Sequence, residues 1–182
     1  MHFVPKRVFF VRGTGYHISE LGSFEQALRD AGIEKFNLVK VSSILPPNCL
    51  EIPKMDGLAQ LKAGQIVHTV MSKMSSNELN FFLCASIGVA IPKDKKAYGY
   101  LSEYRYSGAD EESLGEIAED LAAEMLASTL GVRLDTGTDY DKNKEMFKLN
   151  GKIIKTKNIT ETATVKKEGE WCTVLAAAVF IL

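Results

Sequence analysis

Strand-like segments dominate this chain, and only two stretches have the periodicity of a helix. Strands are predicted at about eight places, where β-branched and aromatic residues alternate with polar ones or form short apolar runs. These segments are Val8–Val11, Lys35–Ser43, Gln65–Met71, Leu83–Ile91, Ala97–Tyr104, Lys152–Thr156, Ile159–Lys166 and Trp171–Ile181. Because two helices cannot cover both faces of a parallel sheet, we predict an α+β fold: a four-layer αββα-type sandwich of mainly antiparallel sheets with helices packed outside.

Each predicted helix begins at a serine with the spacing of a capping box. In the first, Ser23 lies three residues before Gln26, and Gly32 marks the C-terminal end. In the second, Ser113 lies three residues before Glu116. Apolar residues recur at helical spacing in both, so we expect each helix to have one buried face. The residues predicted to be buried are Phe24, Ala27, Leu28 and Ala31 in the first helix and Leu114, Ile117, Ala118, Leu121 and Met125 in the second.

Three other segments have a characteristic composition. Arg12–His17 contains two glycines, Gly13 and Gly15, and is predicted to break the first strand with a tight turn. The charged segment Asp135–Lys148 is predicted to be an exposed excursion or a long hairpin. The last residues, Thr173–Leu182, form an apolar run about half as long as the ~20 residues that a membrane-spanning helix needs. We therefore predict a buried strand there, with alanines that allow close packing.

Length and charge fit a soluble, single-domain protein. The chain has 182 residues and a net charge of −1, with 22 basic and 23 acidic residues. The charges are interspersed, so neither nucleic acid nor membrane is predicted as a partner. Cys49, Cys84 and Cys172 lie far apart without a C-x-x-C motif, which disfavours disulfides and indicates the cytoplasm. The histidines are also scattered, and no metal site is predicted.

The segment Lys40–Pro47, KVSSILPP, ends a strand-like run with two serines and then two prolines. One interpretation is a polar turn, because proline cannot continue a strand. The other is that the peptide bond between Ser42 and Ser43 breaks. The Ser43 hydroxyl can attack the preceding carbonyl to form an ester, and loss of the Ser43 Cα proton then expels the Ser42 carboxylate. Hydrolysis leaves a pyruvoyl group. From these residues alone, both interpretations remain open.

The longer segment AGIEKFNLVKVSSILPP resembles the cleavage segment of the pyruvoyl-dependent arginine decarboxylases. Further stretches resemble that family in the same order: GSFEQAL before it, ASIGVAIPKD and GYLSEY after it, and LAAAVF near the end. The similarity extends over about Arg7–Gly131 and the last strands. It implies a β chain of residues 1–42 and an α chain of residues 43–182. It also implies a covalent pyruvoyl cofactor made from Ser43, with no metal and no pyridoxal phosphate.

The resemblance further implies roles for individual residues. The pyruvoyl group from Ser43 forms a Schiff base with the α-amine of L-arginine, so that CO₂ leaves and agmatine, a precursor of polyamines, remains. Glu103 matches the acidic residue that returns a proton, and Asn37 matches an active-site asparagine. Glu25 matches the carboxylate that receives the substrate's guanidinium group. The implied substrate-binding residues are Glu25, Asn37, Ser42 and Ile44.

Strand geometry constrains how these residues meet. Asn37 and Ser43 are six residues apart, so a straight strand separates them by about 20 Å. One chain cannot then bring both into one site unless the strand bends sharply. We therefore expect Asn37 and Glu25 to act on the pyruvoyl group of an adjacent subunit. The resemblance likewise implies a homo-oligomer, a trimer or a dimer of trimers, with active sites between subunits.

Two features depart from the family pattern. Familiar members have aspartate where this chain has Glu25, and Asp135–Gly151 looks like an insertion. These departures leave open the same pyruvoyl chemistry on another amino acid, such as histidine, ornithine or aspartate. An uncleaved paralogue that binds a partner is a further alternative, although Ser43, Asn37 and Glu103 are all present. A serine hydrolase is disfavoured, because the chain has no G-x-S-x-G motif.

Overall fold

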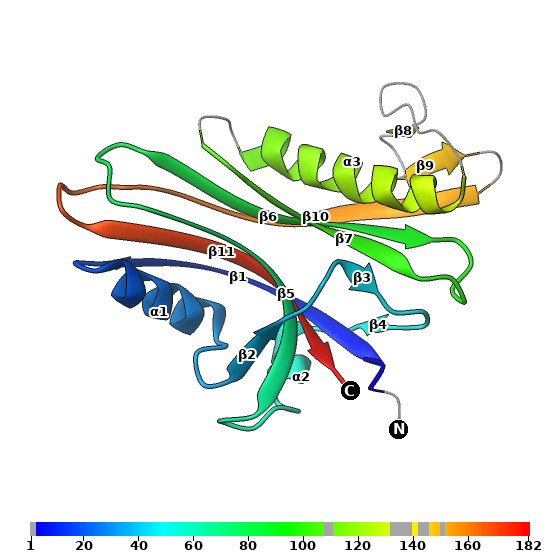
Figure 1. Cartoon of the computed structure of the whole chain (residues 1–182), viewed down its shortest axis with the longest axis horizontal. Coiled ribbons are helices and arrows are strands. Elements are labelled where there is room, and N and C mark those ends of the chain that lie inside the picture. Colours follow the sequence, from blue (N-terminus) through cyan, green and yellow to red (C-terminus); the bar gives the residue numbers. More distant parts are fainter. Residues whose placement is uncertain (1–2, 108–110, 132–139, 142–145, 150–151) are drawn as a thin grey trace.

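The structure of the protein is a computed structural model that describes residues 3–107, 111–131, 140–141, 146–149 and 152–182. Two sheets pack face to face, and each has a helix on its outer side (Figure 1). Helix α3 (Glu111–Thr129) covers one sheet and α1 (Glu20–Ala31) covers the other, while α2 (Lys54–Leu58) is a short helix that contacts the first strand. The predicted four-layer α+β sandwich is confirmed.

The sheet next to α1 has the strand order β2-β5-β11-β1-β4. Its strands are β1 (Arg7–His17), β2 (Asn37–Lys40), β4 (Leu50–Glu51), β5 (Ile66–Ser76) and β11 (Trp171–Ile181). The long strands β1 and β5 pair antiparallel with β11, whereas β2 and β4 are added in parallel at the edges. Because β11 is central, its residues from Cys172 to Ile181 are buried, which confirms the predicted buried strand.

The sheet next to α3 has the strand order β3-β7-β6-β10-β9-β8, and all its pairs are antiparallel. Its strands are β3 (Ile44–Leu45), β6 (Phe82–Pro92), β7 (Gly99–Tyr106), β8 (Tyr140–Asp141), β9 (Met146–Leu149) and β10 (Lys152–Thr164). The core between the two sheets includes Ala176 and Ala178 of β11 and Ile87 of β6. The small side chains of these alanines therefore let the two sheets pack closely, as predicted from the alanine-rich sequence of the last strand.

The described residues contain more strands than the sequence predicts. The additional ones are the short strands β3, β4, β8 and β9, which are too brief to have a recognisable period. In contrast, β10 joins two predicted strands, Lys152–Thr156 and Ile159–Lys166, into one. Strands β8 and β9 pair antiparallel, as the predicted hairpin would require in this part of Asp135–Lys148. The other residues of that segment lie outside the described ones.

The predicted turn at Arg12–His17 is wrong, because β1 continues without a break to His17. Its glycines have a packing role instead of a conformational one. A methyl group at Gly15 would overlap with the backbone of Ser23 in α1, and one at Gly13 would overlap with that of Ala27. The glycines therefore let α1 lie directly on β1.

Both helices begin earlier than predicted. Ser19, not Ser23, caps α1, and its side chain accepts a hydrogen bond from a backbone N–H of the first turn. Helix α3 begins at Glu111, so Ser113 lies inside the first turn. The capping-box pattern is local and does not distinguish a serine at the helix end from one just inside it. Gly32 ends α1 as predicted, in the left-handed conformation with φ of 78°.

The buried face of α3 differs in part from the predicted one. Its fully buried residues are Leu114, Ala118, Ala122, Ala123, Leu126 and Ala127. Ile117 and Met125 were predicted to be buried but are 39% and 36% exposed. The alanine face lies against the sheet because Gly88 of β6 leaves room for the backbone of Ala118, whose carbonyl oxygen accepts a 2.5 Å hydrogen bond from Ser102. Among the described residues, no helix combines the length and apolar character needed to cross a membrane.

We predict that Gly15→Ala destabilises the fold, because the added methyl group forces α1 away from β1. Overpacking of this kind costs about 1–3 kcal/mol in the free energy of unfolding, measurable by urea denaturation. Gln26→Ala on the exposed side of the same helix is the control, and it should change the free energy by less than about 0.5 kcal/mol. Equal stability of the two variants would show that the α1–β1 contact tolerates a side chain.

Candidate active site

The two serines of KVSSILPP lie where the chain passes from one sheet to the other. The Val41 N–H donates a 2.9 Å hydrogen bond to the carbonyl oxygen of Thr69, in β5 of the first sheet. The Ser43 carbonyl oxygen accepts a 2.8 Å hydrogen bond from the Leu101 N–H, in β7 of the second sheet. Ser42 is the one residue between these two anchors. The bond between Ser42 and Ser43 therefore has a fixed attachment on each side.

A tight turn forms at this crossing. The Ile44 N–H donates a 3.0 Å hydrogen bond to the carbonyl oxygen of Ser42, which is the pattern of a γ-turn centred on Ser43. Asn48 and Asn80 are the non-glycine residues with positive φ in the described chain, so Ser43 adopts the inverse form of the turn. The predicted strand Lys35–Ser43 is thus too long, since β2 ends at Lys40 before the crossing.

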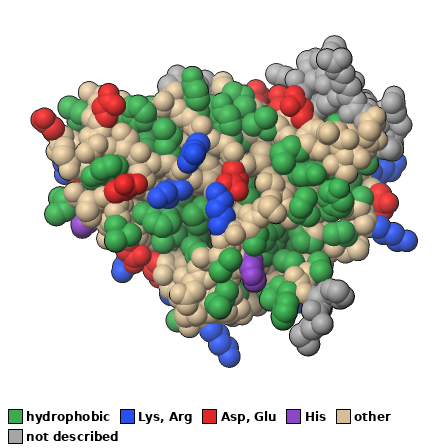
Figure 2. Space-filling view, viewed as in Figure 1, with side chains coloured by type: hydrophobic (Ala, Val, Ile, Leu, Met, Phe, Trp, Pro, Cys, Tyr) green, Lys and Arg blue, Asp and Glu red, His purple; other side chains and the backbone are tan. Residues whose placement is uncertain are grey.

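A cleft of about 600 Å³ lies beside the crossing, between the two sheets and α1. It is lined by Phe24, Leu28, Phe36, Asn37, Leu38, Lys40, Thr69, Met71, Ser72, Lys73, Glu103 and Arg105. The cleft therefore brings together two of the predicted site residues, Asn37 from β2 and Glu103 from β7. On the face seen in Figure 2, Lys and Arg side chains gather near the centre around an acidic one, with hydrophobic side chains about them.

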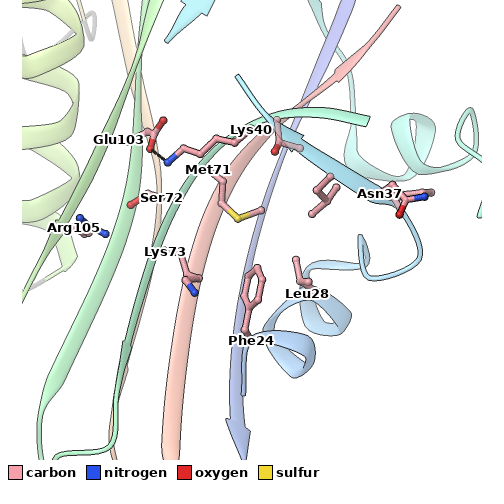
Figure 3. Close-up of a pocket in the computed structure, with 12 residues that line it drawn as sticks. Phe24, Leu28, Asn37, Lys40, Met71, Ser72, Lys73, Glu103 and Arg105 are labelled. Atoms are coloured by element: carbon pink, nitrogen blue, oxygen red, sulfur yellow. Dashed lines mark ion pairs between the residues drawn. The ribbon is translucent and has the colours of Figure 1, made fainter. Parts of the chain in front are cut away.

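Glu103 and Asn37 are each held by a specific partner. The Lys40 Nζ lies 2.5 Å from Oε2 of Glu103, and this ion pair joins β2 of one sheet to β7 of the other. The Asn37 side-chain amide donates a 2.7 Å hydrogen bond to the carbonyl oxygen of Gly64. Figure 3 shows the ion pair at one end of the cleft and Asn37 at the other, with Met71 between them.

The remaining predicted site residues lie elsewhere on the chain. Ser42 and Ile44 line a second hollow of about 460 Å³, together with His68 and apolar residues that include Phe180. Ser43 lines neither hollow. Within this single chain, Ser42 and Ile44 thus line a different hollow from Asn37 and Glu103.

Glu25 is a partly buried residue of α1 and lies outside both hollows. Its Oε1 accepts a 3.1 Å hydrogen bond from Nε of Arg29 and lies 3.0 Å from Nη2 of the same residue. Its helical neighbours Phe24 and Leu28 line the cleft. Glu25 is therefore near the cleft but turned toward a guanidinium group of its own helix.

Cys49 is another nucleophilic side chain near the crossing. It packs at the edge of the core between the sheets, and burial raises the pKa of its thiol to about 11. Because the thiolate is the reactive form of cysteine, Cys49 is a poor nucleophile near neutral pH. This favours Ser43 over Cys49 for chemistry at the crossing.

Lys40 and His68 were not among the predicted site residues. Lys40 contacts Glu103 through a sheet-to-sheet ion pair, and His68 lies in β5 opposite Val39 of β2. Both contacts depend on which strands become neighbours in the folded protein. A local sequence pattern does not indicate the order of the strands in a sheet.

Comparison with known proteins shows the family of this chain. A family model described as pyruvoyl-dependent arginine decarboxylase matches residues 7–182. A protein of Chloroherpeton thalassium named probable pyruvoyl-dependent arginine decarboxylase is 51% identical over 181 residues, with 100% of both chains covered. A protein of Nitrosopumilus maritimus named pyruvoyl-dependent arginine decarboxylase is 48% identical over 182 residues, again with 100% of both covered. The pyruvoyl-dependent arginine decarboxylase 2 of Methanosarcina mazei is 47% identical over 98% of this chain and 97% of its own. The chain therefore belongs to the pyruvoyl-dependent arginine decarboxylase family.

Proposed function

We propose that this protein cleaves its own Ser42–Ser43 bond and then converts L-arginine to agmatine and CO₂. Family membership supports the reaction, since the relatives carry that activity in their names. The crossing between the sheets supports the cleavage position, because it holds the bond between two fixed backbone groups. That geometry is the observation on which the proposal mainly rests.

The γ-turn suits the first step of cleavage. The Ser43 Oγ attacks the carbonyl carbon of Ser42, the bond to the Ser43 nitrogen breaks, and an ester and a free amine result. Negative charge develops on the Ser42 carbonyl oxygen during this attack. The Ile44 N–H, which already donates to that oxygen at 3.0 Å, can stabilise the charge as an oxyanion-hole donor does.

The later steps release Ser42 and change Ser43. Loss of the Ser43 Cα proton expels the Ser42 carboxylate and leaves dehydroalanine. Addition of one water and departure of one ammonia then give the pyruvoyl group. The products are a β chain of residues 1–42 and an α chain of residues 43–182.

The sheet order supports a stable association of the two products. Residues 1–42 contain β1, α1 and β2. β1 lies between β11 and β4, and β2 pairs with β5, so each strand of the small chain borders a strand of the large one. Cleavage at the crossing removes no hydrogen bond of these ladders.

A pyruvoyl group at position 43 supplies a ketone that condenses with the substrate α-amine and accepts the electrons released as CO₂ departs. Glu103 is proposed to return a proton to the substrate carbon, because it is the acidic side chain of the cleft nearest the crossing along β7. Asn37 is proposed to orient the substrate by hydrogen bonds. Glu25 is proposed to receive its guanidinium group.

Each active site is proposed to be formed by residues of two neighbouring subunits in a trimer or a dimer of trimers. In one chain, Ser42 and Ile44 face one hollow, while Asn37 and Glu103 face the other. A second copy can place its Asn37 and Glu25 next to the processed terminus of the first. Exposed apolar residues on the edge strand β2 and on its neighbour β5, Val39 and Ile66, support association of copies at this edge of the sheet.

We expect the purified protein to consist of two chains divided after Ser42. The larger chain should be blocked at its N-terminus and lighter by one ammonia than a chain that starts with serine. Intact-mass spectrometry measures both properties. Ser43→Ala, which lacks the attacking hydroxyl, should stay in one piece. A wild-type chain that also stays in one piece would contradict self-processing and favour a non-catalytic binding protein.

We expect Glu103→Gln to be cleaved but to lose about 10²–10⁴-fold in turnover, because a positioned general acid contributes about that factor. CO₂ release from L-arginine measures the loss. Glu168→Gln, on the exposed turn between β10 and β11, is the control and should keep wild-type turnover. A Glu103→Gln enzyme with near-normal turnover would exclude Glu103 as the proton donor.

We expect Glu25→Gln to lower the preference for arginine over ornithine, lysine, histidine and aspartate. A carboxylate–guanidinium contact is worth about 1.5–3 kcal/mol, which corresponds to a preference of roughly 10- to 150-fold. The ratio of kcat/KM values for arginine and each competitor measures it. Gln26→Ala on the same helix should leave the ratio unchanged. A wild-type enzyme that prefers a substrate without guanidinium would overturn the arginine assignment.

A further inference from the structure

We infer that Lys73 and Arg105 form a binding site for the α-carboxylate of the substrate, at the end of the cleft away from Asn37. This inference rests on the proposed function, in which the cleft takes part in binding L-arginine. It adds a third contact to those proposed for the guanidinium group and the α-amine, and it sets the direction in which the substrate lies. A hydrogen bond between the sheets and the charges of the cleft support it.

The hydrogen bond between the sheets brings the two cations to the same place. The Ser72 Oγ donates a 2.6 Å hydrogen bond to the carbonyl oxygen of Tyr104, which joins β5 of one sheet to β7 of the other. Lys73 and Arg105 are the next residues of these two strands. Each therefore lies one residue, about 3.4 Å, along its strand from the bonded pair. Both line the cleft, and Figure 3 shows them at the end away from Asn37.

The cleft has more positive charge than its own carboxylate can balance. Three cations line it, Lys40, Lys73 and Arg105, and Glu103 is the one acidic residue of its lining. Lys40 already pairs with Glu103. Within the described residues, neither Lys73 nor Arg105 forms an ion pair with a carboxylate. These two charges therefore attract an anionic group that enters the cleft.

Both cations keep hydrogen-bond donors available for a ligand. The Lys73 Nζ lies 4.5 Å from the centroid of the Phe24 ring, a contact that places the ammonium group without an acceptor atom. Arg105 is exposed, and a guanidinium group has five N–H donors in a geometry that matches a carboxylate. An amino-acid substrate brings such a carboxylate, whereas its decarboxylated product has none. The site therefore distinguishes substrate from product.

This contact should contribute to substrate binding more than to the chemical step. The carboxylate loses its negative charge as CO₂ departs, so its attraction to the cations weakens on the way to the transition state. Because Arg105 is exposed and Lys73 is partly exposed, solvent also limits the strength of the contact. Loss of either cation should therefore raise KM for L-arginine, while kcat stays the same or rises.

The first test measures KM and kcat for L-arginine, and the inhibition constant of agmatine, in the processed enzymes. Lys73→Met and Arg105→Met should each raise KM by about three- to tenfold, between the effects of an exposed ion pair and of a well-formed hydrogen bond to a charged group. The inhibition constant of agmatine should not rise, because agmatine has no carboxylate. Unchanged KM in both variants would overturn the inference, as would an equal rise in KM and in the agmatine inhibition constant.

Two further variants are controls for charge. Lys73→Arg keeps the positive charge and should have a KM close to that of the wild type. Lys166 also lies over an aromatic ring, with its Nζ 5.3 Å from the centroid of Tyr16, but it is outside the cleft. Lys166→Met should therefore keep wild-type KM and kcat. A rise in KM as large as that of Lys73→Met would indicate an effect of overall charge and would overturn the inference.

A second measurement needs neither turnover nor a Schiff base. Calorimetric titration compares δ-guanidinovalerate, which has the guanidinium and carboxylate groups of arginine but no α-amine, with pentylguanidine, which lacks the carboxylate as well. The wild type should bind δ-guanidinovalerate more tightly than pentylguanidine. This preference should fall in the double variant Lys73→Met, Arg105→Met, while binding of pentylguanidine is retained. An unchanged preference would overturn the inference, as would an equal loss of affinity for both compounds.

Failure of this inference can be told apart from failure of the proposed function. If the wild type prefers δ-guanidinovalerate through Lys73 and Arg105 but does not decarboxylate L-arginine, the proposed reaction fails and the carboxylate site stands. If the wild type decarboxylates L-arginine and both single variants keep its KM, only the carboxylate site fails.

Discussion

The pairing of β1 with β11 is the interaction on which the rest of the structure depends. It runs from Arg7 opposite Ile181 to His17 opposite Trp171 and joins the beginning of the chain to its end. Helix α1 packs on both strands, and the glycines of β1 make this close contact possible. Because the ladder is antiparallel and central, the N-terminal segment is part of the core. The proposed backbone break after Ser42 is therefore expected to leave the fold intact.

The crossing between the sheets is the proposed place of that break. Val41 is bound to the first sheet and Ser43 to the second, so their separation is set by the packing of the two sheets. Once both sheets have formed, little freedom remains for the backbone at Ser42, whose carbonyl the Ser43 hydroxyl is proposed to attack. Holding two reacting groups near each other raises their effective concentration and so speeds their reaction. Processing is thus expected to follow folding, because the geometry does not exist before the sheets pack.

Local sequence patterns predicted the elements that are long enough to show their own hydrophobic period. The long strands β5, β6, β7 and β11 have strong apolar or β-branched patterns and were predicted, whereas β3 and β4 are too short to show a period. The glycines of β1 were misread as a turn, because only the approach of α1 explains them. At the site, motif similarity indicated Ser43, Asn37 and Glu103. It could not indicate Lys40, because its contact with Glu103 depends on how the sheets pack. The Glu25–Arg29 pair has i,i+4 spacing and could be read from the sequence.

The charges of the cleft favour a site completed by a second subunit. Lys40, Lys73 and Arg105 line it with one carboxylate, Glu103, which Lys40 already binds. Arginine carries a cationic guanidinium group, so this cleft alone offers that end of the substrate more repulsion than attraction. The hollow beside Ser42 is lined mainly by apolar residues and suits an alkyl chain better than a charge. A partly exposed carboxylate outside both hollows, such as Glu25, is the kind of group that must be added to bind the guanidinium. A neighbouring copy can supply it, and this is the physical reason to propose a site divided between subunits.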